Sequence, residues 1–177
     1  MVVVAIIGNP SSGKRTLATA LCARRPLAVI GTQEVGAAIS TATTPIASEA
    51  KGLVERGDVL PGQLFGALLA EVVGELDAVI VGLPRTLDEL QAFLSNCASP
   101  VSVIHLRASQ AVIDARRHAV GLRPIEVEHP GALQRLSKGL APVLAAAGRS
   151  KRLLELDANL LLAELVEHAD RFLDATS

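Results

Sequence analysis

The sequence predicts an α/β fold, a parallel five-stranded sheet with helices on both faces. Short apolar or β-branched runs alternate along the chain with longer segments whose apolar residues follow helical spacing. Strands that are separated by helices need crossover connections, which make the strands parallel and cover both faces of the sheet. With 177 residues, 50% of them hydrophobic, the chain is long enough to bury one core. We therefore expect a single domain over residues 1–177.

The predicted strands are short apolar runs, namely VVVAII (2–7), LAVI (27–30), AVIV (78–81), VSVIHL (101–106) and RLLEL (152–156). Helical spacing of apolar residues predicts helices over 16–24, 63–75, 111–119 and 159–173. The stretch 31–61 is too long for a simple crossover, and it is predicted to hold two helical pieces around Thr44-Pro45. An insertion of this kind often forms a small mobile unit over a site.

Composition argues against nucleic acid and membrane partners. Aromatic residues are only 2% of the chain, which leaves no platform for stacking bases, and the formal net charge is -1. The apolar run 2–7 is far too short to span a bilayer and no basic segment precedes it, so neither a signal peptide nor an anchor is predicted. Cys22 and Cys97 have no metal-like spacing and are expected to be reduced thiols. We expect a soluble, cytoplasmic monomer.

A glycine-rich stretch, GNPSSGKRT (8–16), lies between the first predicted strand and a predicted helix. Gly8 and Gly13 allow a tight turn whose amides point at phosphate oxygens, and Lys14 supplies a charge for the outer phosphates. This Walker A pattern predicts nucleotide binding by Gly8, Asn9, Pro10, Ser11, Ser12, Gly13, Lys14, Arg15 and Thr16. The residue after Lys14 is Arg15, where the common pattern has Ser or Thr, and the hydroxyl comes one position later at Thr16.

A Gly-x-Pro-x-x-Gly-Lys-x-Thr loop is the form found in adenylate kinase and its nucleoside monophosphate kinase relatives, which this chain resembles. AKGLVERGDVLP (50–61) is similar to the family's Ala-Lys segment followed by Gly-x-Leu-Val-Pro, and VGLPRTLDEL (81–90) is similar to Asp-Gly-Phe-Pro-Arg-Thr. RLSKGLAPVL (135–144) is similar to the Arg-Leu…Ala-Pro-Val run near the family's C-terminus. The motifs occur in family order, and the resemblance implies a P-loop NTPase-like fold.

The resemblance implies transfer of the terminal phosphoryl group of ATP to a nucleoside monophosphate, with AMP as the acceptor and Mg²⁺ bound with ATP. Catalysis in this family is positioning and charge neutralisation. The matching positions imply catalytic roles for Lys14, Arg85, Arg116, Arg123 and Arg135, with Thr16 on the metal side. They also imply an acceptor site in the insertion 31–61 that includes Thr32, Val59, Gly82, Arg85 and Glu89, and a residual short lid over 117–129.

The sequence departs from the family pattern at several matching positions. Val81 replaces an aspartate that orients the water around Mg²⁺, and Ala37 replaces an arginine that binds the monophosphate. An intermediate lid arginine falls on Val120, although Arg117 could substitute for it. Glu89 replaces a glutamine that reads the base, and a carboxylate only accepts hydrogen bonds, which suits guanine or the adenine amine alone.

Two alternatives therefore remain beside the kinase interpretation. One is a nucleotide-binding protein of this fold with little or no catalytic activity, favoured by Val81, Ala37 and the short lid. The other is a kinase of a different small phosphate acceptor, which would explain the altered acceptor residues but not the preserved segment 50–61.

Overall fold

A computed structural model describes residues 1–176 as an α/β fold with a five-stranded, wholly parallel sheet. The strand order is β2-β3-β1-β4-β5. The strands are β1 (Val3–Ile7), β2 (Ala28–Ile30), β3 (Ala78–Val81), β4 (Val101–Arg107) and β5 (Leu153–Asp157). The predicted fold class is confirmed, and each strand boundary lies within one residue of its prediction.

The helices of the described chain are α1 (Lys14–Cys22), α2 (Thr32–Thr41), α3 (Pro45–Glu55), α4 (Gly62–Val73), α5 (Leu87–Asn96), α6 (Gln110–Ala119), α7 (Ile125–Glu128), α8 (Ala132–Arg149) and α9 (Leu162–Thr176). The two helices expected around Thr44-Pro45 are confirmed, and α3 begins there because the Thr44 side chain accepts a hydrogen bond from the Ala47 amide. The last helix starts three residues later than predicted, because the Glu164 carboxylate accepts from the Leu161 amide at 2.9 Å and fixes the first turn there.

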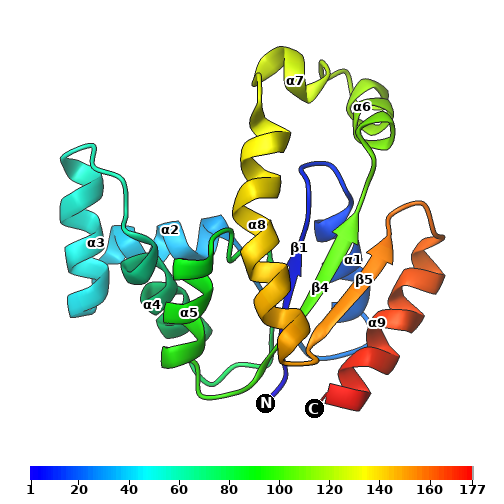
Figure 1. The fold of residues 1–177 in the computed structure, drawn as a ribbon. Coiled ribbons are helices and arrows are strands. Elements are labelled where there is room, and N and C mark those ends of the chain that lie inside the picture. Colours follow the sequence, from blue (N-terminus) through cyan, green and yellow to red (C-terminus); the bar gives the residue numbers. More distant parts are fainter. Residues whose placement is uncertain (177) are drawn as a thin grey trace.

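Alternation along β1 divides the core between the two faces of the sheet. Its odd-numbered residues face α4, α5 and α8, and its even-numbered residues face α1 and α9 (Figure 1). The first cluster includes Val3, Ala5, Ile7, Leu68, Leu69, Phe93, Leu140 and Val143; the second includes Val4, Ile6, Leu17, Leu21, Leu165, Val166 and Leu173. No helix within residues 1–176 is both long and apolar enough to cross a membrane.

The carboxyl ends of the parallel strands meet at one edge of the sheet, where ligands bind in α/β folds. The upper half of α8 and the pair α6–α7 rise above this edge, while α2 and α3 extend away from the sheet on the other side (Figure 1). The edge is therefore flanked by two projecting arms.

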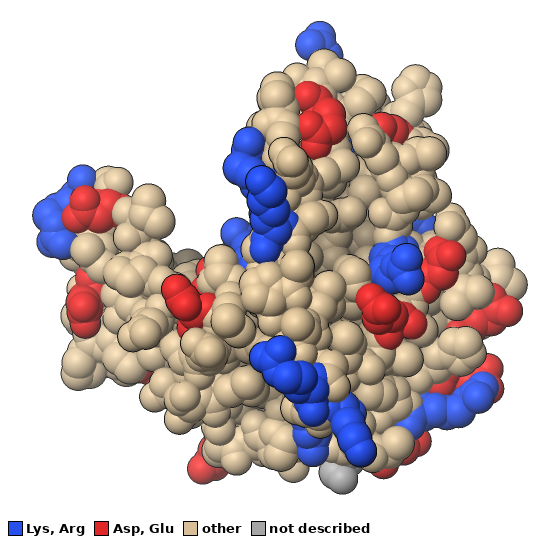
Figure 2. Space-filling model, viewed as in Figure 1, with Lys and Arg blue, Asp and Glu red and all other residues tan. Residues whose placement is uncertain are grey.

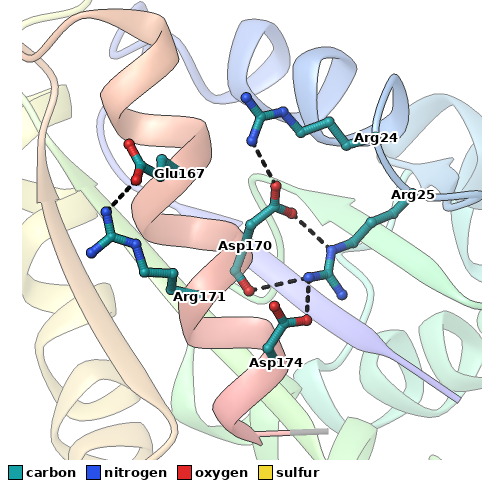
Figure 3. A network of polar contacts seen from close by, with 6 residues as sticks. All are labelled: Arg24, Arg25, Glu167, Asp170, Arg171 and Asp174. Atoms are coloured by element: carbon teal, nitrogen blue, oxygen red, sulfur yellow. Dashed lines mark hydrogen bonds and ion pairs between the residues drawn. The ribbon is translucent and has the colours of Figure 1, made fainter.

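A cluster of charges joins the end of α1 to α9 (Figure 3). Asp170 accepts from Arg24 Nη1 at 3.0 Å and from Arg25 Nε at 2.8 Å, and Arg25 also pairs with Asp174. A separate pair, Glu167 and Arg171, lies one turn apart on α9. The helix that starts at the glycine-rich loop is thus fixed at its opposite end.

We expect Asp170→Asn to lower the free energy of unfolding by about 1–2 kcal/mol at neutral pH, because it removes a partly buried charged acceptor. Burial raises the pKa of Asp170, but the hydrogen bonds from Arg25 and Arg24 outweigh it and hold the pKa below its ordinary 3.8. The ionised group therefore stabilises the fold above about pH 4, and this contribution is lost as pH falls through the lowered pKa.

Urea unfolding of both proteins across this pH range measures the effect. The difference between wild type and Asp170→Asn should disappear at the acid end. The matched control is Glu167→Gln, whose exposed ion pair with Arg171 should change stability by less than about 0.5 kcal/mol. Equal losses in the two variants would contradict the assignment.

Candidate nucleotide site

The glycine-rich loop occupies residues 8–13, between β1 and α1, and its shape depends on two glycines. Gly8 has φ +144°, and a Cβ there would lie 2.3 Å from the carbonyl oxygen of Leu106 on β4. Gly13 precedes α1 in the left-handed region, with φ +100°. Side chains at these positions would clash or be strained, so the loop requires glycine at both.

The loop and the start of α1 present polar groups that lack protein partners. The Ser12 side chain is only 1% exposed, and its Oγ has no hydrogen-bond partner in the described chain. No side chain caps the N-terminus of α1, and its first turn contains no acidic residue. A buried unpaired hydroxyl is costly, and free helix N-terminal amides favour an anion. The loop is therefore built for a negatively charged ligand.

Lys14 is held against this loop. Its Nζ donates to the carbonyl oxygens of Gly8 at 3.0 Å and Asn9 at 2.6 Å. Burial lowers the Lys14 pKa to about 8, and the nearby Arg85 cation contributes to the lowering. A Cβ on Gly82 would lie 3.6 Å from Lys14 Cε, which places the side chain beside the carboxyl end of β3.

Arg85 follows β3, and three contacts fix its backbone and side chain. Its Nε donates to Gly82 O at 3.3 Å, and its amide donates to Glu89 Oε2 at 2.6 Å. A Cβ on Gly139 of α8 would lie 2.9 Å from Arg85 O, so α8 passes directly over this peptide. Lys14 and Arg85 form no ion pair with any residue in 1–176. Two unneutralised cations therefore lie at one strand end.

Glu89, which the resemblance places beside the acceptor base, already has a partner. The hydrogen bond from the Arg85 amide occupies one of its two carboxylate oxygens. The Thr86 hydroxyl accepts from the Glu89 amide and caps α5, so both residues define the turn that positions Arg85.

Arg116 reaches from α6 to the backbone of the loop. Its Nη1 donates to Ser12 O at 2.6 Å and to Ser11 O at 3.4 Å, and its Nη2 donates to Ala158 O at 2.6 Å. The structure thus brings this predicted site residue to the loop, where it joins the loop to the turn after β5.

Arg117 is not available to replace the missing lid arginine. It is 8% exposed, its Nε donates to Arg123 O at 2.7 Å, and its Nη2 pairs with Glu128. It fastens α6 to α7 across the predicted short lid. These contacts remove the alternative that Arg117 substitutes for the arginine expected at Val120.

Arg123 and Arg135 lie on the arm formed by α7 and the start of α8. Both are exposed, and Arg135 Nη1 donates to Pro130 O at 3.0 Å. Within residues 1–176, neither guanidinium hydrogen-bonds to the loop 8–16. Figure 2 shows a wide notch between this arm and the α2–α3 arm, with Lys and Arg side chains on the α8 wall.

The implied acceptor residues of the insertion 31–61 are exposed. Thr32 is exposed at the start of α2, and Val59 is 90% exposed in the turn before α4. Ala37 is also exposed, on α2. Lys51, a basic residue of the insertion 31–61, donates to Ser40 O at 3.3 Å and so serves the contact between α3 and α2.

A cavity of about 500 Å³ borders the loop and the start of α1. Its polar wall includes Ser11, Ser12, Thr16 and Arg116, and its apolar wall includes Val120, Ala158, Leu160 and Leu162. This size and mixed lining are typical of a small-molecule site. Sequence reasoning missed the turn 158–161, because these residues carry no motif and 159–161 fell inside the predicted helix 159–173.

No protein-family model matches the chain. Adenylate kinase 1 of Synechocystis is 28% identical over 162 residues, which cover 86% of this chain and 87% of that protein. Adenylate kinases of Lactobacillus delbrueckii and Micrococcus luteus are each 27% identical, over 64% and 56% of this chain. The chain resembles the adenylate kinases. It spans 57% of the length of the Lactobacillus protein and 52% of the length of the Micrococcus protein. The resemblance predicted from the motifs is confirmed.

The adenylate kinase-like chain supplies few ligands for Mg²⁺, which proteins usually bind through one or two carboxylates as well as phosphates. Thr16 offers a neutral hydroxyl, and the end of β3 carries the apolar Val81. Asp88, in the first turn of α5, has its Cβ 3.0 Å from the position of a Cβ on Gly62 of α4. Residues 1–176 contain no group of three His, Cys, Asp or Glu side chains that could hold a metal ion. The residues therefore do not fit a metal ion held by the protein.

Proposed function

We propose that this chain is a nucleoside monophosphate kinase of the adenylate kinase type, which transfers the terminal phosphoryl group of ATP to AMP. One observation carries the proposal: a loop shaped for phosphate, with the buried Ser12 hydroxyl unpaired, lies beside the unneutralised cations of Lys14 and Arg85. In phosphoryl transfer the protein mainly positions the two substrates and neutralises charge. A cation pair at a strand's carboxyl end suits that task.

In this proposal each part of the site has its own role. Lys14 and the loop amides hold the ATP phosphates, and the cavity lined by Arg116 and Leu160 receives the base and sugar of ATP. Arg85 binds the acceptor phosphate, with the insertion 31–61 around the acceptor nucleoside. Residues 117–129 are a residual lid, and the exposed Arg123 and Arg135 contribute further positive charge toward a bound nucleotide.

The proposal is tested by a coupled assay of the purified chain with ATP and each nucleoside monophosphate, run with and without Mg²⁺. Formation of ADP that depends on AMP supports it. The second candidate, a nucleotide-binding protein with little activity, is favoured by Ala37, because no second arginine from α2 faces the acceptor. Tight ATP binding in calorimetry, with no transfer to any monophosphate, would support that candidate instead.

We expect Ala37→Arg to lower the Michaelis constant for AMP about tenfold, since it adds one charged contact of about 1.4 kcal/mol to the acceptor phosphate. No arginine lies between Arg25 and Arg56, and Lys51 is engaged by Ser40, so the insertion offers no substitute of its own. Steady-state kinetics with AMP and GMP in parallel measure the change and the base preference.

The control for this variant is ATP affinity, which should not change because the two nucleotides occupy different ends of the site. Gln33→Arg, an exposed position in the first turn of α2, serves as a matched variant that adds the same charge elsewhere. An unchanged constant for both acceptors would mean that the insertion 31–61 is not a monophosphate site.

A further inference from the structure

Three consecutive residues at the start of α1 reach three different parts of the site. Lys14 Nζ donates to carbonyl oxygens of the glycine-rich loop, and Thr16 lines the cavity proposed for the base and sugar of ATP. Arg15 lies elsewhere, because its Nη2 is 3.9 Å from the position that a Cβ on Gly31 would take. Gly31 is the N-cap of α2 and begins the insertion 31–61. Arg15 therefore extends toward the segment proposed for the acceptor, and Thr16 toward the donor.

The Arg15 guanidinium has no partner in the described chain. The residue is exposed, and within residues 1–176 its side chain forms no hydrogen bond or ion pair. One carboxylate is close: Glu34 Oε2 lies 3.5 Å from the same Cβ position on Gly31. It accepts from the Gly31 amide at 2.7 Å and so caps α2 instead of pairing with Arg15. The planar fork of Arg15 is therefore available to a ligand.

Strand order brings Arg15 to the strand end that carries Arg85. Because β2 and β3 are neighbours, Val81 O at the end of β3 lies 3.8 Å from that same Cβ position. The next residue, Gly82, accepts from Arg85 Nε at 3.3 Å, and a Cβ on it would lie 3.6 Å from Lys14 Cε. Three cations without acidic partners thus lie at one corner of the sheet edge. A phosphate monoester, with nearly two negative charges at neutral pH, suits this corner.

The insertion 31–61 supplies no free cation of its own. Its basic residues are both engaged: Lys51 donates to Ser40 O, and Arg56 pairs with Asp58. A second positive charge for an acceptor phosphate must therefore come from another element.

We propose that Arg15 binds the phosphate of the acceptor nucleoside monophosphate together with Arg85. The inference rests on the proposed function, in which Arg85 and the insertion 31–61 hold the acceptor. Arginine suits the role because it is always charged and its fork can donate two parallel hydrogen bonds to phosphate oxygens. The helix that carries Arg15 is also held in place, because α1 is tied to α9 at its far end.

Calorimetric titration of the whole chain with AMP and with ATP tests the proposal. Arg15→Gln should weaken AMP binding at least about tenfold, the effect of losing one charged contact, and should leave the ATP dissociation constant within about threefold of wild type. Arg15→Lys keeps the charge but loses the fork, so its loss of AMP affinity should be smaller, about threefold. Arg149→Gln, an exposed arginine at the end of α8, is the matched control and should change neither affinity.

A rescue experiment tests whether the charge acts on the phosphate. In the Arg15→Gln background, Ala37→Arg should return AMP affinity to within about threefold of wild type, because it offers the same phosphate a different arginine. Gln33→Arg, which adds an equal charge at an exposed position of α2, should not. Circular dichroism and a melting curve confirm that each variant is folded.

The outcomes separate this inference from the proposed function. If Arg15→Gln binds AMP as wild type does while Arg85→Ala does not, Arg15 does not contact the acceptor phosphate and the kinase proposal stands. If Arg15→Gln loses as much affinity for ATP as for AMP, or if Gln33→Arg rescues AMP binding as well as Ala37→Arg does, the inference also falls and the kinase proposal stands. If wild type binds ATP but neither binds AMP nor phosphorylates it, both proposals fall.

Discussion

Lys14→Ala is expected to weaken ATP binding about 10- to 150-fold, or about 1.5–3 kcal/mol, the range for a charge-assisted hydrogen bond. In the free protein Lys14 Nζ donates to Gly8 O and Asn9 O, so its charge is already fixed over the loop before a ligand arrives. Alanine removes that charge and leaves two partly buried carbonyl oxygens without this donor. Calorimetric titration with ATP measures the loss.

The pH dependence of binding identifies Lys14 as the group responsible. Burial lowers its pKa to about 8, so the side chain is charged below that pH and loses its charge above it. Wild-type affinity for ATP should therefore fall as pH rises from 7 to 9, and Lys14→Ala should show no such fall.

Lys151→Asn is a control for this series, because Lys151 is exposed in a left-handed turn that asparagine tolerates. It should bind ATP as wild type does. Equal ATP affinities for wild type and Lys14→Ala would show that the loop does not hold the nucleotide.

Arg85→Ala is expected to lower kcat/KM for AMP about 100- to 1,000-fold, the effect of removing one preorganised donor from developing charge. Arg85 is preorganised because Gly82 O accepts from its Nε and α8 covers its peptide at Gly139. Arg85→Lys keeps the charge but loses the planar fork, and we expect an intermediate loss of about tenfold. Steady-state kinetics with varied AMP measure both.

Two further measurements on Arg85→Ala test whether the loss of activity comes from the acceptor phosphate. The dissociation constant for ATP in Arg85→Ala should stay within about threefold of wild type. Removal of the Arg85 cation should also raise the Lys14 pKa, so the pH at which ATP affinity falls should move above 8. An equal loss of ATP affinity and of transfer would place Arg85 on the donor phosphates and not on the acceptor.

Local sequence signals determined the strands, the loop and the breaks between helices. A strand buried on both faces must be a short apolar run, and that requirement is visible in AVIV (78–81) without knowledge of its neighbours. Gly8 and Gly13 are recognisable because only glycine adopts those backbone angles beside β4. Thr44-Pro45 marks the start of α3 because both residues satisfy a helix N-terminus locally.

Only the tertiary structure decided which groups each arginine contacts and which arginines have no acidic partner. Arg116 joins the loop more than a hundred residues earlier in the sequence, and Arg117, its neighbour on α6, is buried against Glu128. Sequence spacing cannot separate these two, because one helical step turns a side chain to a different face of the helix. Val81 at the end of β3 lies beside Gly31 at the end of β2 only because these two strands are neighbours in the sheet, and strand order is something that no local pattern records.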